Sequence, residues 1–181
     1  MRLLIFLFTL VASVGVDASG LPDAPIGFEW IVSSNGVGTF LKPAGWHVKE
    51  EVRDGTNALF ITKQPIEDGQ YYSTGMAVNQ FNNFSNRSKY SASQYSQAYI
   101  AEIIQTNNVI KSFKIPSSSG EMYGVRIVGN NNGVETIVHY LAFGNDIEDK
   151  VYLLWYESPK TEWDENYAAG STMLNMFGFG E

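Results

Sequence analysis

One segment constrains the fold of this chain more than any other: residues 150–157, KVYLLWYE. In a strand, successive side chains point to opposite faces of the sheet. Both faces are apolar here, because one receives Val151, Leu153 and Trp155 and the other receives Tyr152, Leu154 and Tyr156. A strand that is apolar on both faces is covered on both. The segment therefore predicts a central strand with one packed layer above the sheet and another below it.

Two hairpins are predicted from turn dipeptides that stand between alternating segments. Asp54-Gly55 and Asn132-Gly133 both suit a type I′ turn, which requires positive φ at its two central residues. Around the first of these turns, the count gives one core face, formed by Trp46, Val48, Val52, Leu59 and Ile61. Glu50 falls on that face as well, and we expect a bulge or a strand end there rather than a functional buried carboxylate.

The sequence Pro43-Ala44-Gly45-Trp46 predicts a corner between two strands. Proline cannot donate to a ladder and glycine tolerates positive φ, so a strand ends there and the chain changes direction. The same cluster would also suit the lip of a binding site. We interpret it as a corner and expect Trp46 to fold back over the core.

Two amphipathic helices are predicted. The first covers residues 92–106 and starts with a capping box at Ser91. The last element is a second helix, with Pro159 at its first position and a further capping box that begins at Thr161. Its apolar face follows helical spacing through Trp163, Tyr167, Gly170, Leu174 and Phe177.

The order of these elements is several strands, a helix, a four-stranded meander and a closing helix. Such an order is typical of an α+β fold. We predict a single-domain α/β/α sandwich over residues 28–181, with a central, mostly antiparallel sheet and an amphipathic C-terminal helix. Residues 19–27 form a lead-in to this domain.

Residues 1–18 have the pattern of a cleaved signal peptide. Arg2 is followed by an apolar run, and small side chains at Val16 and Ala18 suit a cleavage site. The apolar run is shorter than the roughly 20 residues that a membrane-spanning helix needs. We therefore predict export, an extracytoplasmic location (periplasmic or secreted) and no integral membrane segment after cleavage.

Charge and cysteine content exclude several classes of function. The formal net charge of −7 opposes binding to nucleic acid. The chain has no cysteine, so thiol catalysis and cysteine metal sites are excluded, and stability must come from packing. It contains no phosphate loop, zinc-protease motif or nucleophile elbow, and we predict no cofactor. Glycosylation-type triplets begin at Asn83 and Asn86, and their occupancy stays open.

The strongest candidate for a site lies on the second hairpin. Counting outward from Asn132-Gly133 places Arg126 opposite His139, and Glu135 lies on the same face as His139. A guanidinium, a carboxylate and an imidazole on one face suit the binding of an anion or the positioning of a proton. The competing interpretation is an ion pair at the rim of the sheet beside a hydrogen-bonded histidine.

A second candidate is the acidic segment NDIED, residues 145–149. Its side-chain oxygens (Asn145, Asp146, Glu148 and Asp149) would suit a calcium ion. We favour the alternative, a solvated acidic turn, and predict no metal site.

Several structural residues of this chain resemble the PsbP-like family. They are Phe40, Pro43, Gly45 and Trp46 in the corner, Tyr156 and Pro159 in the segment YESP, and the final FGF after the amphipathic helix. This family has the fold of the photosystem II extrinsic subunit, which is shared with a nuclear Ran-binding protein family and with small exported bacterial proteins. The resemblance covers roughly residues 28–179. It implies the fold and a binding or assembly role, and it assigns no functional residue to this chain.

Two functions of different classes remain open. The first, which we favour, is an exported, non-enzymatic binding or assembly accessory protein whose partner is another protein or a small ligand. The second is a small hydrolase or metal-dependent enzyme that uses Arg126, Glu135 and His139. A deep pocket around His139 with a perturbed carboxylate would favour the enzyme, whereas an open aromatic or flat sheet surface would favour binding.

Overall fold

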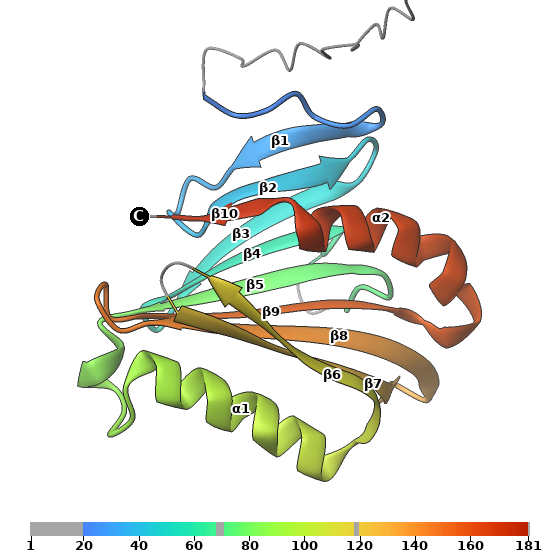
Figure 1. Cartoon of the computed structure of the whole chain (residues 1–181). Helices are drawn as coiled ribbons and strands as arrows, with labels where there is room; N and C mark the ends of the chain where they lie inside the picture. The colour runs from blue at the N-terminus through green and yellow to red at the C-terminus, as the bar shows by residue number, and fades with distance from the viewer. Residues whose placement is uncertain (1–19, 68–70, 118–119, 181) are drawn as a thin grey trace, which may run out of the picture.

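A seven-stranded antiparallel sheet forms the centre of the protein (Figure 1). The computed structural model describes residues 20–67, 71–117 and 120–180. Along the sheet the strands follow the order β3-β4-β5-β9-β8-β7-β6. They are β3 (His47–Arg53), β4 (Thr56–Thr62), β5 (Gly75–Asn82), β9 (Lys150–Pro159), β8 (Val134–Asn145), β7 (Gly120–Asn131) and β6 (Asn108–Ser117). The segment KVYLLWYE is β9, so the prediction of a central strand is confirmed.

One layer covers each face of this sheet (Figure 1). On one face lies helix α1 (Ala92–Thr106). On the other lie helix α2 (Trp163–Asn175) and a three-stranded sheet in the order β1-β2-β10. The strands of this smaller sheet are β1 (Phe28–Val32), β2 (Gly38–Pro43) and β10 (Phe177–Phe179). The predicted α+β sandwich is thus confirmed, although the smaller sheet was not predicted.

Each layer encloses its own apolar core. The core beneath α1 includes Ile100, Val125, Ile127, Val151 and Leu153. The core between the main sheet, α2 and the smaller sheet includes Phe40, Leu59, Ile61, Leu154, Tyr156 and Met173. The alternating side chains of β9 therefore enter different cores, as the sequence pattern requires.

Both hairpins have the predicted register. Asn132 and Gly133 adopt positive φ in the turn between β7 and β8, and Arg126 pairs with His139 across it. In the hairpin of β3 and β4, Glu50 pairs with Leu59 and no register shift occurs. The core face is only partly as predicted, because Val48 and Val52 stay exposed while Leu59 and Ile61 are buried. β3 is an edge strand, so the core does not extend beneath its ends.

The bulge expected at Glu50 is therefore wrong. Its carboxylate accepts hydrogen bonds from the backbone N–H of Ser34 at 3.0 Å and of Asn35 at 3.1 Å, and from the Ser34 hydroxyl at 2.5 Å. Partial burial acts to raise the pKa of Glu50, but these hydrogen bonds outweigh it and lower the pKa. Glu50 holds the turn between β1 and β2 against the edge of the main sheet.

The corner after β2 is confirmed. Gly45 has a φ of 79°, and the N–H of Trp46 donates to the carbonyl of Pro43 at 3.1 Å. Trp46 packs against the core beneath the smaller sheet but stays partly exposed. Trp155 is likewise partly buried, against the core beneath α1.

Helix α1 has the predicted bounds and the predicted capping box between Ser91 and Gln94. The start of α2 was predicted wrongly. Strand β9 runs through Pro159, a 3₁₀ turn η2 (Lys160–Glu162) follows, and the α-helix begins only at Trp163. No side chain caps that helix, so the Thr161 capping box is wrong as well. A further 3₁₀ turn, η1 (Phe84–Asn86), precedes α1.

The apolar face predicted for α2 is correct up to Leu174. Phe177 belongs instead to β10, where it pairs with Phe40 of β2. The predicted signal peptide lies outside the described residues, and the division of the chain at residues 18 and 27 stays a prediction. Among the described residues, no helix is long and apolar enough to cross a membrane.

Candidate functional site

The structure brings together two of the three predicted site residues. Nη2 of Arg126 lies 3.2 Å from Nδ1 of His139. The Arg126 guanidinium lies over the ring of Tyr167, 4.3 Å from its centroid, and 5.1 Å from the ring of Trp163. Both aromatic residues belong to α2, so this site lies where the helix covers β7 and β8.

Glu135 does not join them. It lies four residues from His139 along β8, which is roughly 13 Å in a strand. Its carboxylate forms an ion pair with Lys160 at 2.8 Å, and both side chains are about half exposed. Glu135 is thus engaged in an ion pair with Lys160 at the sheet rim, whereas His139 is hydrogen-bonded to Arg126 farther along the strand.

His139 is a neutral hydrogen-bond acceptor. Burial, with the positive charges of Arg126 and Lys111, lowers its pKa from 6.5 to about 4. Since arginine only donates, Nδ1 must carry a lone pair and the ring proton must lie on Nε2. The hydroxyl of Tyr167 is a further neighbour of Nδ1, at 3.4 Å. His139 thus orients the guanidinium of Arg126 rather than pairing with an acid.

Lys111 is a member of this site that the sequence did not reveal. It pairs with Arg126 in the register of β6 and β7, so the two side chains lie on the same face. Its Nζ lies 5.8 Å from the ring centroid of Phe113, and Phe113 in turn contacts His139 edge to face at 5.3 Å. The site is therefore cationic and aromatic.

Glu157 is a second residue that the sequence did not single out. It lies on β9, and burial raises its pKa from 4.5 to about 7, although hydrogen bonds with the side chains of Tyr72 and Asn131 act in the opposite direction. A carboxyl group that titrates near neutral pH is a candidate for function. Its position in the segment YESP gave no indication that it would be buried.

The acidic segment at residues 145–149 connects β8 to β9. The carboxylate of Asp146 accepts from the N–H and hydroxyl of Ser93 at 2.8 and 2.6 Å. The carboxylate of Asp149 accepts from the N–H and hydroxyl of Ser85 at 2.8 and 2.7 Å. These oxygens fasten the turn to the start of α1 and to η1.

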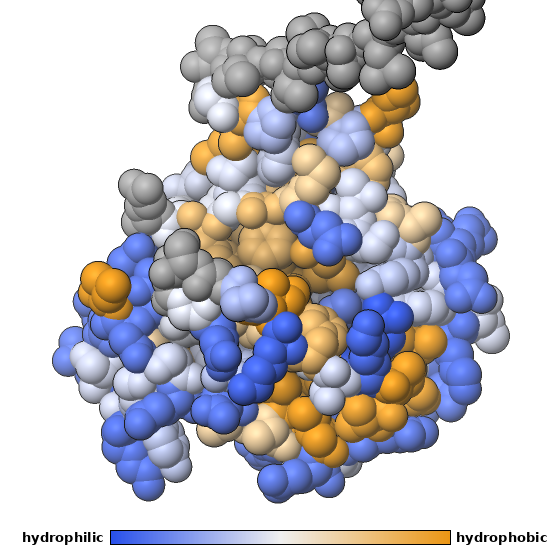
Figure 2. Space-filling model, in the orientation of Figure 1, coloured by the Kyte–Doolittle hydropathy of each residue, from blue (hydrophilic) through white to orange (hydrophobic). Residues whose placement is uncertain are grey.

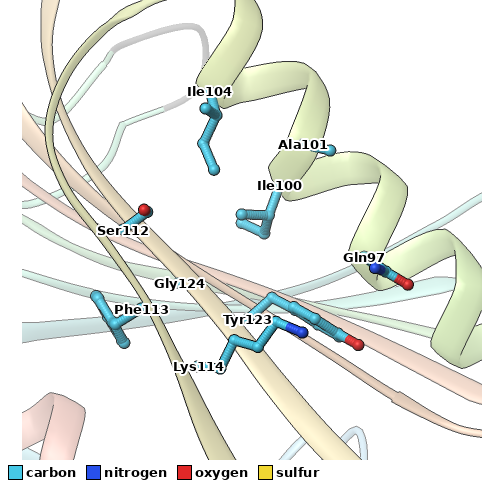
Figure 3. Close-up of a pocket in the computed structure, with 9 residues that line it drawn as sticks. All are labelled: Gln97, Ile100, Ala101, Ile104, Ser112, Phe113, Lys114, Tyr123 and Gly124. Carbon is cyan, nitrogen blue, oxygen red and sulfur yellow. The ribbon is translucent and has the colours of Figure 1, made fainter.

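An apolar groove of about 400 Å³ lies between α1 and the hairpin of β6 and β7. Figure 3 shows Ile100 and Ile104 projecting from α1 toward the strands, with Tyr123 and Lys114 side by side across the groove. In Figure 2 hydrophobic side chains gather at the lower right, where Figure 1 places the end of α1 and the start of β6. Ile104 and Ile110 are 38% and 50% exposed.

The groove borders an open sheet edge. Within the described residues, β6 has β7 as its one strand neighbour. A register shift between Val109 and Lys111 places Ile110 in a bulge near the start of the strand. An exposed edge with free backbone groups and apolar side chains is a place where another chain can pair.

Comparison of the fold with solved structures identifies its class. The chain matches no family model and no curated protein sequence. The Ran-binding protein Mog1p of Saccharomyces cerevisiae matches with a TM-score of 0.52 and 12% identity, over 84% of this chain and 95% of that one. A protein of Bacteroides thetaiotaomicron matches with a TM-score of 0.50 and 10% identity, over 86% of this chain and 50% of that one.

The cyanobacterial PsbP of Synechocystis has a TM-score of 0.49 and 12% identity, over 86% of this chain and 94% of that one. The strand order and the likeness to Mog1p place the chain in the class of α+β sandwiches with helices on both sides of an antiparallel sheet. Within that class, the chain has a PsbP/Mog1-like fold, as the corner and the segment YESP suggested. At such identities the likeness concerns the fold alone.

Proposed function

We propose that this chain is an exported, non-enzymatic binding or assembly protein whose partner is another protein. The observation that carries the proposal is the apolar groove beside the open edge of β6. An extended segment of a partner would pair with the β6 backbone and place apolar side chains against Ile104 and Tyr123. The N-terminal sequence supports an extracytoplasmic location, in the periplasm or outside the cell.

The geometry around His139 gives less support to the enzyme alternative. Glu135 is engaged by Lys160 rather than by Arg126 or His139. A general base works best with a pKa near the operating pH, whereas the pKa of His139 is lowered to about 4 and its Nδ1 already accepts a hydrogen bond. Mog1p, which shares the fold, is likewise a binding protein.

Capture of partners from the exported fraction of the native host tests the proposal. The tagged wild type is compared with Ile104→Glu in the groove and with Ile147→Glu, a matched change at an isoleucine that is 92% exposed elsewhere. We expect a partner that binds wild type and Ile147→Glu alike and binds Ile104→Glu at least about tenfold more weakly, a loss of about 1.4 kcal/mol.

Two results would count against the proposal. A partner captured equally by all three proteins binds elsewhere than in the groove. A wild type that captures nothing beyond the tag alone would refute the protein-binding function itself. Circular dichroism of both variants confirms that each is folded before the comparison is made.

A further inference from the structure

Strand β6 borders the groove as an open edge of the main sheet, and its charged side chains are all positive. It carries Lys111 and Lys114 but no acidic residue, in a chain with 19 acidic residues against 12 lysines and arginines. Lys111 is exposed, and among the described residues no carboxylate forms an ion pair with it. Lys114 lines the groove and lies 3.4 Å from the carboxylate of Glu121, but both side chains stay more than half exposed. Such an exposed ion pair contributes little to stability, so both lysines are available to a partner.

The opposite edge of the main sheet differs from β6 in two respects. The side chain of Asn35 donates to the backbone carbonyls of Glu51 at 3.3 Å and Ala58 at 2.9 Å, so the turn between β1 and β2 lies against β3. The charges of β3 are of both signs, and Lys49 forms an ion pair with Glu51 at 3.0 Å. A single sign of charge is therefore a feature of β6 and not of every sheet edge in this protein.

Residues 111–115 of β6 are the part of this edge that can pair with a further strand. The bulge at Ile110 interrupts the strand before them, and Pro116 after them has no backbone N–H to donate. The two lysines are three positions apart, so they point to opposite faces of the sheet. Between them lie Ser112, whose small side chain lines the groove (Figure 3), and Phe113, whose ring reaches the α2 face.

We propose that β6 pairs with an extended acidic segment of the partner, in which two carboxylate side chains flank two apolar ones. This inference rests on the proposed function and adds the chemistry of the partner segment. Side chains directly opposite on neighbouring strands have Cβ atoms about 4.5–5.5 Å apart, so each carboxylate lies within reach of one lysine. The apolar residue opposite Ser112 enters the groove toward Ile104 and Tyr123, and the one opposite Phe113 packs on its ring. The pattern acid, apolar, apolar, acid is the same in both chain directions, so a parallel or an antiparallel segment satisfies it.

Lysines on an edge strand also prevent a chain from pairing with further copies of itself. A second copy that paired through β6 would place two more lysines along the same five residues, and like charges on neighbouring strands repel. Protection alone does not explain the apolar side chains of the same edge, because Ile110 and Ile115 are 50% and 45% exposed. The two lysines therefore select among partners, since they repel a basic or identical strand and attract an acidic one.

Titration of the full chain into four fluorescent peptides tests the proposal. The peptides share the same polar flanks, and their cores are Glu-Ile-Ile-Glu, Gln-Ile-Ile-Gln, Lys-Ile-Ile-Lys and Glu-Ser-Ser-Glu. By fluorescence anisotropy we expect the Glu-Ile-Ile-Glu peptide to bind with a Kd of about 100 μM or below, and the other three at least about tenfold more weakly. Added salt should weaken its binding, because the lysines are exposed. Nuclear magnetic resonance should show the largest shifts at the backbone amides of residues 111–115.

Matched lysine variants locate the site. Lys111→Gln and Lys114→Gln should each weaken binding of the Glu-Ile-Ile-Glu peptide at least about threefold, and the double variant at least about tenfold. Lys89→Gln, a change at an exposed lysine outside the groove, should leave the Kd unchanged. The double variant Lys111→Glu/Lys114→Glu should prefer the Lys-Ile-Ile-Lys peptide. Because a reversed preference requires a folded edge strand, it cannot result from a failure to fold.

Three outcomes would overturn the inference. They are no saturable binding of the Glu-Ile-Ile-Glu peptide, equal binding of the Gln-Ile-Ile-Gln peptide, and equal loss of binding in Lys89→Gln and the two β6 variants. Capture of native partners separates this inference from the proposed function. A partner that requires Ile104 but binds the double glutamine variant as tightly as the wild type would overturn the acidic segment and leave the proposed function standing. Binding of the acidic peptide at β6 without any captured partner would count against the proposed function alone.

Discussion

Two titratable residues on neighbouring central strands should give the stability of this protein opposite dependences on pH. His139 of β8 pairs with Tyr156, and the next residue of β9 is Glu157. Folding lowers the pKa of His139 from 6.5 to about 4 and raises the pKa of Glu157 from 4.5 to about 7. On unfolding, His139 takes up a proton between about pH 4 and 6.5, and Glu157 releases one between pH 4.5 and about 7, so the two pH ranges overlap.

His139 favours the folded state at high pH. Between pH 6.5 and about 4 the unfolded chain binds a proton at this residue and the folded chain does not. The free energy of unfolding therefore falls as the pH falls through this range. At about 1.4 kcal/mol per pKa unit, the full change is about 3 kcal/mol.

Glu157 favours the folded state at low pH. Between pH 4.5 and about 7 the folded chain keeps a proton on this carboxyl group that the unfolded chain has lost. The free energy of unfolding therefore falls as the pH rises. Because the side chain is partly exposed, solvent screening reduces the effect, and we expect about 2 kcal/mol.

The two contributions oppose each other between pH 4.5 and 6.5, so single substitutions should reveal each of them. Relative to the wild type, the stability of Glu157→Gln should increase with pH by about 2 kcal/mol between about pH 4.5 and 7. As the pH rises from about 4 to 6.5, the stability of His139→Asn relative to the wild type should decrease by about 3 kcal/mol. The asparagine retains an acceptor near Arg126.

Urea unfolding at intervals of about one pH unit from about pH 4 to 8 measures these differences. Each variant is compared with the wild type at the same pH, so that carboxylates elsewhere contribute equally and cancel. The refuting result is a constant difference from the wild type across the whole range. Such a result would mean that the folded protein leaves the pKa of that residue at its ordinary value.

Three further predictions concern processing and packing. Protein recovered from the native host should begin at Ser19, and an intact mass that includes residues 1–18 would contradict this. Replacement of Trp46 or Trp155 by alanine should cost about 2–4 kcal/mol in urea unfolding, less than for a fully buried tryptophan; a loss below about 1 kcal/mol would place that residue on the surface. Gly144→Ala should destabilise the protein by about 1–3 kcal/mol, because the new Cβ would lie 2.1 Å from the carbonyl oxygen of Ala92; unchanged stability would show that α1 can shift.

The parts of the fold that the sequence predicted are those governed by local rules. The two-sided apolar pattern of β9, the Asn132-Gly133 turn and the capping box at Ser91 each depend on a few adjacent residues. The register of Arg126 and His139 followed from the turn alone, because a type I′ turn fixes the pairing on both sides.

The parts that the sequence missed depend on contacts between distant segments. Strand β10 has three residues, one of them glycine, and it exists because β2 offers a partner far away in the sequence. Glu50 lies on an apolar face because the turn at Ser34 and Asn35 donates hydrogen bonds to it. Neither partner can be inferred from the residues that surround each segment.

The candidate site was predicted in part for the same reason. Arg126 and His139 share a hairpin with an unambiguous turn, whereas the segment SSSG between Lys111 and Arg126 has no dipeptide that fixes a register. Glu135 was assigned to the site because alternation places it on the same face as His139. Alternation gives the face but not the distance, and Lys160 lies nearer.

The hairpin of β6 and β7 presents different chemistry on its two faces because side chains alternate along a strand. Lys111 and Phe113 lie on the α2 face with Arg126, while Lys114 lies on the α1 face beside Tyr123, 4.9 Å from its ring centroid. Since β6 is one of the two edge strands of the sheet, several of its side chains, among them Ile110 and Ile115, stay exposed. A central strand could not serve two surfaces in this way, because both of its faces are covered.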